Sequence, residues 1–256
     1  LNDDLAYGYN RAKLAWYVVD PLFLRNTSTT PAYIKNNPIL QSNNLVREVY
    51  ESELFPDKEE VVGQPTNIPL LDLAFYPSER GPYNYDTNPS SYSKGINTDG
   101  SLRDPESRWG GIMRKVETSD FEAANIEYIE FWMMDPFIND PDKKTKGGDL
   151  YFNLGDISED VLKDSRKGFE NGLPTTSEVA NVDSTAWGRV STLQSTVNEF
   201  DNSTQSRKYQ DLGFDGLNDD DEQSFHKSYL ESLKSILNQD ALEKAMAQNI
   251  DLVLAD

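Results

Sequence analysis

The chain has 256 residues, enough for one large domain or two small ones whose core needs no disulfide support. Its 44 acidic and 24 basic residues give a net charge of −20, which repels nucleic acid and anionic lipid and favours cations and basic partners. Cysteine is absent, which excludes disulfides and thiolate chemistry, and no stretch approaches the roughly 18 apolar residues of a membrane helix.

For residues 1–107 the sequence predicts a mixed region of strands, one helix and loops. We expect this region to pack on a β-sandwich formed by the residues that follow. Strands are predicted over residues 11–20 and 67–77. Between them we expect a long loop at residues 25–44, which are rich in Asn, Thr, Ser and Pro. A helix is then predicted over residues 44–54, because its apolar residues have helical spacing: Leu45, Val49, Tyr50 and Leu54.

For residues 108–204 the sequence predicts the core of an antiparallel β-sandwich with one short helix. Three strand-like runs start at Arg108, Asn125 and Gly147, and turn-rich segments separate them. Ser158 is placed to cap the short helix. The fold class expected is therefore mainly β with α, a sandwich with peripheral helices.

For residues 205–256 the sequence predicts an acidic loop followed by C-terminal helices. From Glu222 onward the apolar residues recur at helical spacing, in one stripe and then a second. A break between two helices is expected near Asn238.

The acidic run at residues 127–137 (EYIEFWMMDPF) raises the question whether its glutamates form a catalytic pair. On a strand, Glu127 and Glu130 point to opposite faces, because neighbouring side chains alternate. A glycosidase needs two carboxyl groups about 5–10 Å apart across one cleft. The run therefore predicts a sandwich strand with an acid on each face, and Trp132 in the core. A partner acid from another strand stays an alternative.

Residues 211–222 form a twelve-residue acidic loop whose spacing is similar to that of an EF-hand calcium loop. Gly213 stands at one ligand position, so the site is one side chain short, and a water would fill the gap. The alternative is an acidic helix start that needs no metal. The predicted calcium ligands are four side chains and the backbone carbonyl of a leucine: Asp211, Asp215, Leu217, Asp219 and Glu222.

Other catalytic motifs are missing from the sequence. His226 is the only histidine, and with no cysteine this excludes zinc sites and Cys/His nucleophiles. The chain has no G-x-S-x-G elbow, phosphate loop or dinucleotide fingerprint. We therefore expect a protein that is not an enzyme, with a carboxylate glycosidase as a remote alternative.

Four long phrases stand in collinear order in the sequence: YPSERGPYNYD (76–86), RWGGIMRKVETSDFEAANIEYIEFWMMDPF (108–137), GGDLYFNLGDISEDVLKDSRKGFENGLP (147–174) and YQDLGFDGLNDDDE (209–222). Together they resemble one family, the SprA (Sov) gliding-motility proteins of Bacteroidetes. These are outer-membrane translocons of the type IX secretion system. The likeness extends from about residue 11 to residue 222, and the C-terminal helices carry little of it.

The resemblance implies a non-catalytic extramembrane piece of a very large β-barrel translocon, with a structural, gating or partner-binding role. The implied partners are the rest of the barrel, a smaller outer-membrane barrel, a plug protein and secreted cargo. The implied location is the outer membrane, with the extracellular side favoured over the periplasm.

A second, fold-level likeness concerns residues 129–155, which are similar to strands of galactose-binding-like jelly rolls. It keeps open another function, a carbohydrate-binding module of a bacterial surface protein. Tyr or Trp side chains exposed on one concave sheet face would favour that module, whereas buried ones would favour the translocon domain.

Overall fold

The computed structural model describes residues 5–59, 66–118, 120–138, 140, 142, 144–155, 182–184, 189–191, 203–206, 217 and 219–247. The chain divides into two compact units, one of Leu1–Lys13 with Pro77–Asp256 and one of Leu14–Tyr76. We call them the large unit and the small unit. This division differs from the predicted boundaries at residues 107 and 204, which stay a prediction. The short helix predicted after Ser158 lies outside the described residues.

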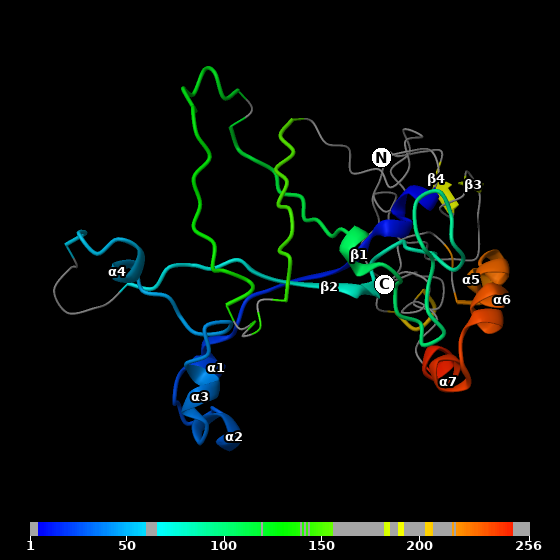
Figure 1. The fold of residues 1–256 in the computed structure, drawn as a ribbon, viewed down its shortest axis with the longest axis horizontal. Helices are drawn as coiled ribbons and strands as arrows, with labels where there is room; N and C mark the ends of the chain where they lie inside the picture. Colours follow the sequence, from blue (N-terminus) through cyan, green and yellow to red (C-terminus); the bar gives the residue numbers. More distant parts are fainter. Residues whose placement is uncertain are drawn as a thin grey trace. The chain divides into compact units, whose positions relative to one another are not determined.

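Two sheets of two strands each lie in the described part of the chain (Figure 1). β1 (Ala12–Tyr17) pairs with β2 (Asp72–Arg80), and β3 (Val182–Ser184) pairs antiparallel with β4 (Arg189–Ser191). β2 starts later than predicted and continues through Pro77, because an edge strand has a side on which proline costs no ladder hydrogen bond. The larger antiparallel sandwich stays a prediction.

Single-turn helices are the only helices in the described part of the small unit. Asp20 accepts a hydrogen bond from the N–H of Leu22 (2.8 Å), and Asn37 accepts one from Leu40 (3.1 Å). A proline follows each cap at the first helical position, where its missing N–H costs nothing. The predicted loop at residues 25–44 thus contains helical turns that its own Asn and Pro residues begin. The helices are α1 (Pro21–Leu24), α2 (Ala32–Lys35), α3 (Pro38–Gln41) and α4 (Glu51–Leu54).

The helix predicted over residues 44–54 is reduced to α4. Tyr50 is extended, with φ −85° and ψ 147°, and forms an antiparallel bridge with Asn67. Around it the N–H of Ile68 donates to the carbonyl of Val49 (2.9 Å). A non-local pairing of the backbone therefore overrides the helical spacing at this point.

The C-terminal helices confirm the break predicted near Asn238, but the first of the two predicted helices is divided again at His226. α5 (Asp219–Phe225), α6 (Lys227–Ile236) and α7 (Gln239–Ala247) follow one another, and the break falls at Leu237 and Asn238. The side chain of Asn238 accepts a hydrogen bond from the N–H of Ala241 (2.9 Å), so it caps α7. Among the described residues, no helix has both the length and the apolar character needed to cross a bilayer.

The core of the large unit joins α6 to a long loop that follows β2. Tyr229 and Leu233 of α6 are buried with side chains from β1 and from this loop. The N–H of Asn238 also donates to the carbonyl of Thr98 (2.7 Å). Two 3-10 helices, Leu5–Asn10 and Pro105–Ser107, lie at the start of the unit and at the end of the loop. The buried apolar set is Ala12, Tyr85, Ile96, Leu102, Tyr229 and Leu233.

Residues 109–155 run as three long extended segments joined by two turns (Figure 1). At the first turn the N–H of Ile126 donates to the carbonyl of Phe121 and that of Asn125 to Glu122, with Asn125 left-handed at φ 50°. This is the Schellman pattern, in which Asn tolerates the left-handed position. The three predicted strands are thus extended, but within the described part of the chain they form no ladder beyond a bridge at Trp109.

Replacing Gly95 with alanine is expected to destabilise the large unit by at least about 1 kcal/mol. Gly95 has φ 77°, and an added Cβ would lie 2.8 Å from the carbonyl oxygen of Thr87. Gly111→Ala is the matched control, because nothing lies within 4 Å of a Cβ at that position. Urea unfolding midpoints measure both, and equal midpoints for the two variants would contradict the expectation.

Candidate functional site

A cluster of polar side chains lies buried at the centre of the large unit. We call Asn84, Asp86, Ser93 and Arg108 the buried polar centre; each is at most 6 % exposed. Nη1 of Arg108 lies 3.3 Å from Oδ2 of Asp86, and both side chains are closed to solvent. The hydroxyl of Ser93 donates to the same carboxylate oxygen. Charged groups removed from water in this way must be paired, and here Asp86 meets Arg108 through Oδ2.

Arg108 uses its guanidinium to hold three separate stretches of backbone. It donates to the carbonyls of Tyr9 (2.6 Å), Gly95 (3.1 Å) and Arg103 (2.7 Å from Nη2). Asn84 acts in a similar way: its amide donates to the carbonyls of Tyr9 (3.0 Å) and Arg11 (2.6 Å). The centre therefore ties the N-terminal segment to the loop at residues 81–108.

Burial raises the pKa of Asp86, while hydrogen bonding from Ser93 and the charge of Arg108 oppose that rise. A carboxyl group with a raised pKa is a candidate acid or base at an active site. In this centre, however, the group faces a guanidinium already engaged with carbonyl oxygens, and solvent does not reach it. The arrangement suits cross-bracing of the fold rather than proton transfer to a substrate.

The single histidine lies beside this centre in an aromatic stack. His226 is 6 % exposed, and its ring stacks on Tyr85 with centroids 4.9 Å apart. Tyr229 meets the same Tyr85 edge-on at 5.4 Å. Its hydroxyl accepts a hydrogen bond from Arg80, and burial raises its pKa. His226 thus serves the packing between the loop and α6.

The acids of the predicted strand lie on an exposed extended segment. Glu127 and Glu130 are exposed, and no group of three or more acids or histidines able to hold a metal exists among the described residues. Trp132, predicted to be buried in a core, is 61 % exposed. Its neighbour Phe131 contacts Phe152 of the next extended segment, with ring centroids 5.1 Å apart. Two segments thus lie side by side at this point.

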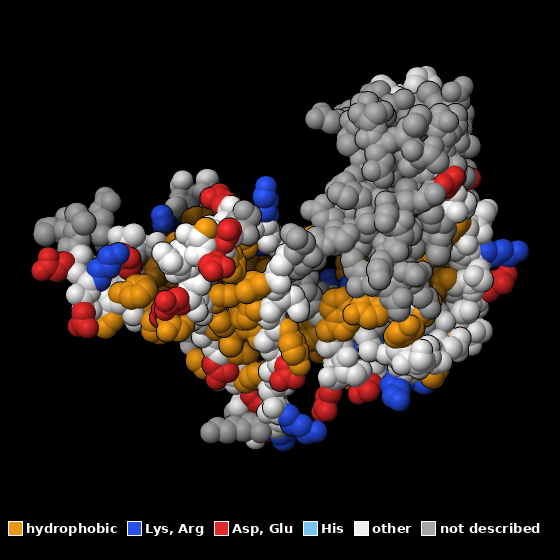
Figure 2. Space-filling model, turned by 90° about the horizontal axis from the view of Figure 1, so that it is seen from above, with side chains coloured by type: hydrophobic (Ala, Val, Ile, Leu, Met, Phe, Trp, Pro, Cys, Tyr) orange, Lys and Arg blue, Asp and Glu red, His pale blue; other side chains and the backbone are white. Residues whose placement is uncertain are grey.

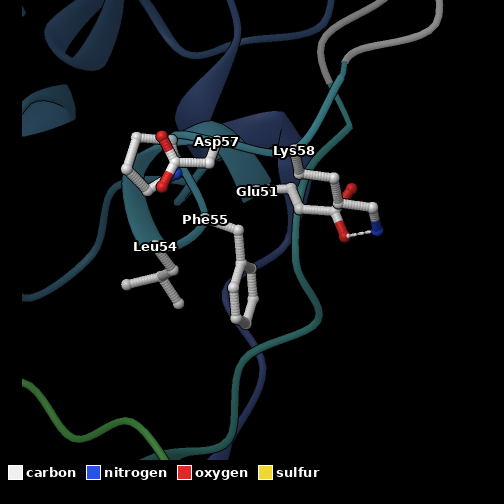
Figure 3. Close-up of a pocket in the computed structure, with 6 residues that line it drawn as sticks. Glu51, Leu54, Phe55, Asp57 and Lys58 are labelled. Atoms are coloured by element: carbon white, nitrogen blue, oxygen red, sulfur yellow. Dashed lines mark hydrogen bonds and ion pairs between the residues drawn. The ribbon is translucent and has the colours of Figure 1, made fainter.

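An open pocket of about 510 Å³ lies in the small unit at the end of α4 (Figure 3). Its two acids, Glu51 and Asp57, point to different sides of Phe55, and Glu51 is paired with Lys58. The pocket is built from one continuous stretch, residues 51–58. Its carboxylates do not face each other as a glycosidase pair would.

The predicted calcium ligands fall largely outside the described residues. Asp211 and Asp215 lie outside them, and of Asp219 only the backbone is described, as the first residue of α5. Leu217 is 2 % exposed and Glu222 is fully buried in the large unit. The calcium site stays a prediction.

Sequence reasoning did not single out the buried polar centre. Asp86 and Arg108 stand 22 positions apart with no common periodicity, so no local pattern pairs them. Their signal was only indirect, since both residues belong to the phrases that carry the family resemblance.

No protein-family model matches the chain, and a search of curated proteins finds no match.

Proposed function

We propose that this chain is a non-catalytic extramembrane domain of a type IX secretion translocon, with a structural, gating or partner-binding role. The observation that carries the proposal is the collinear series of long family-like phrases between residues 76 and 222. Two features of the large unit support it. Its buried charged groups brace the fold, and its extended segments at residues 109–155 offer surface to partners.

Deletion of residues 109–155 from the parent translocon tests this role in cells. We expect cargo to accumulate in the periplasm and gliding to stop, because the deletion removes the exposed segments while leaving Arg108 in place. Glu231→Gln, on the exposed face of α6, is the control and should secrete normally. Normal secretion by the deletion variant, with the parent protein present at its usual amount, would contradict the role.

A separate experiment tests on which side of the outer membrane the domain lies. Because the chain has no cysteine, Lys144→Cys places one thiol at a side chain that is 80 % exposed. We propose an extracellular location, so a membrane-impermeant maleimide should label this thiol on intact cells. Labelling only after the outer membrane is opened would move the domain to the periplasm.

A carbohydrate-binding module is the second candidate, and one observation favours it. Tyr128 and Tyr151 are 83 % and 75 % exposed, and with Trp132 they form an aromatic face. The opposite face is also exposed, however, with Phe131 at 51 % and Phe152 at 55 %, so exposure alone does not mark the tyrosine face for stacking on sugars. Glycan binding that Tyr128→Ala and Tyr151→Ala abolish would replace the translocon proposal with this one.

We further propose that the loop at residues 211–222 binds calcium as a structural ion. Removal of the ion by a chelator is expected to lower the melting temperature, because bound calcium stabilises only the folded state. Asp215→Asn should reduce the response to added calcium, whereas Asp57→Asn in the small unit should not. A melting temperature unchanged by calcium and chelator would leave the acids as a helix start only.

A further inference from the structure

The peptide bond between Asp104 and Pro105 follows a strained backbone. Asp104 is left-handed, with φ 56° and ψ 64°, and a proline comes directly after it. Aspartate tolerates the left-handed region better than most residues, but the ring of a following proline crowds it and favours extended backbone. Acidic side chains reach the surface in several places (Figure 2), so exposure alone does not distinguish Asp104. Among the described residues, however, it is the only aspartate in the left-handed region.

The fold holds the backbone on both sides of this bond. The N–H of Arg103 donates to the carbonyl of Gly95 (3.0 Å), and the carbonyl of Arg103 accepts from Nε (3.0 Å) and Nη2 (2.7 Å) of Arg108. After the bond, the N–H of Arg108 donates to the carbonyl of Pro105 (3.2 Å), and its side chain is fixed in the buried polar centre. The surroundings thus keep Asp104 in its strained conformation, and strain held in this way is concentrated at functional sites.

The carbonyl group of Asp104 is polarised as well. Its oxygen accepts hydrogen bonds from the hydroxyl of Ser107 (2.9 Å) and from the N–H of the same residue (3.1 Å). Two donors on one carbonyl oxygen stabilise the negative charge that develops there when a nucleophile adds to the carbon. The carboxylate of Asp104 is such a nucleophile, because its attack on its own carbonyl carbon closes a ring of succinic anhydride. None of the described residues donates a hydrogen bond to that carboxylate.

We propose that the chain cleaves itself at the bond between Asp104 and Pro105. A carboxylate oxygen of Asp104 bonds to the carbonyl carbon, and the C–N bond to Pro105 breaks. Its electron pair goes to the proline nitrogen, which takes a proton from water. The hydroxide that remains opens the cyclic anhydride and leaves two carboxylates on residue 104, so one water is consumed. The proposal does not depend on the secretion role.

The two pieces should stay together after the cut. Arg108 belongs to the second piece, yet its guanidinium pairs with Asp86 and donates to the carbonyl of Gly95 in the first. Leu102 of the first piece and Tyr229 of the second are buried in the same core. Cleavage therefore removes a covalent link and relieves the strain without opening the large unit.

Intact-mass spectrometry of the full chain, kept folded in mildly acidic buffer, tests the proposal. We expect products of residues 1–104 and 105–256, whose masses together exceed that of the chain by one water. Size-exclusion chromatography should show both products eluting together.

The bond between Asp20 and Pro21 is an internal control. Asp20 is extended, with φ −64° and ψ 132°, and its carboxylate accepts a hydrogen bond from the N–H of Leu22. Cleavage after Asp104 should be at least about tenfold faster than cleavage after Asp20. In concentrated urea the two rates should become similar, because unfolding releases the strain.

Variants at two positions identify the groups that act. Asp104→Asn keeps a side chain that tolerates left-handed backbone but lacks the carboxylate, so cleavage should stop. Ser107→Ala removes one donor and should slow cleavage by at least about tenfold, whereas Ser107→Thr keeps the hydroxyl and should cleave like the parent. The proposal would be overturned by an unchanged intact mass, by equal rates after Asp20 and Asp104 in the folded chain, by cleavage that persists in Asp104→Asn, or by a rate that Ser107→Ala does not change.

Discussion

Arg108→Met is expected to lower the free energy of unfolding by about 3–5 kcal/mol at pH 7. The substitution leaves Asp86 buried without its cation, and the carbonyls of Tyr9, Gly95 and Arg103 lose their donors. Methionine has a comparable reach but no charge, so the loss measures the electrostatic role rather than missing volume. Urea unfolding followed by tyrosine and tryptophan fluorescence gives the free energy.

The loss should depend on pH in a defined direction. Burial already raises the pKa of Asp86 in the folded state, and removal of Arg108 raises it further. A raised carboxyl pKa contributes stability that is full below the unfolded value of about 3.9 and is lost as pH rises through the folded pKa. The deficit of Arg108→Met should therefore be smaller near pH 4 than near pH 7.

Two further variants separate this pair from ordinary salt bridges. Lys13→Met breaks the ion pair with Glu79, whose side chains are about half exposed (53 % and 54 %), and should cost less than about 1 kcal/mol. Arg108→Met/Asp86→Asn should recover part of the loss, because no buried charge then remains uncompensated. A double variant no more stable than Arg108→Met would show that the carbonyl contacts alone carry the effect.

The sequence was most informative where structure depends on local spacing. The C-terminal helices were predictable because Tyr229 and Leu233 repeat at the period of a helix, and Asn238 is a good cap. The helix at residues 44–54 was overestimated, because the pairing of Tyr50 with Asn67 depends on residues far along the chain. Periodicity reports which face is apolar, and it does not report which strand comes alongside.

The same limit applies to the candidate sites. The alternating pattern at residues 126–134 indicated extended backbone. It did not predict the exposure of Trp132, because burial depends on which segments pack against the strand, and the alternation does not specify them. The buried polar centre depends on a loop that folds back so that Asp86 meets Arg108. Loop closure of this kind follows from tertiary packing, and neither residue type nor spacing in the sequence predicts it.

Leu102→Ala is expected to destabilise the large unit by about 2–5 kcal/mol. Leu102 is 2 % exposed and packs in the core with Tyr85, Ile96, Tyr229 and Leu233. Its N–H donates to the carbonyl of Ser78 (2.8 Å), so its backbone is fixed and the surrounding side chains can fill the cavity only in part. Unfolding in urea, followed as for Arg108→Met, measures the loss.

The matched control for Leu102→Ala is Leu154→Ala, which removes the same atoms from a side chain that is 57 % exposed. It should change the free energy of unfolding by less than about 0.5 kcal/mol. Leu102→Met keeps most of the volume and should cost less than about 1.5 kcal/mol. If Leu102→Ala were no worse than Leu154→Ala, the packing between α6 and the loop would not hold the large unit together. The buried polar centre would then be its main support.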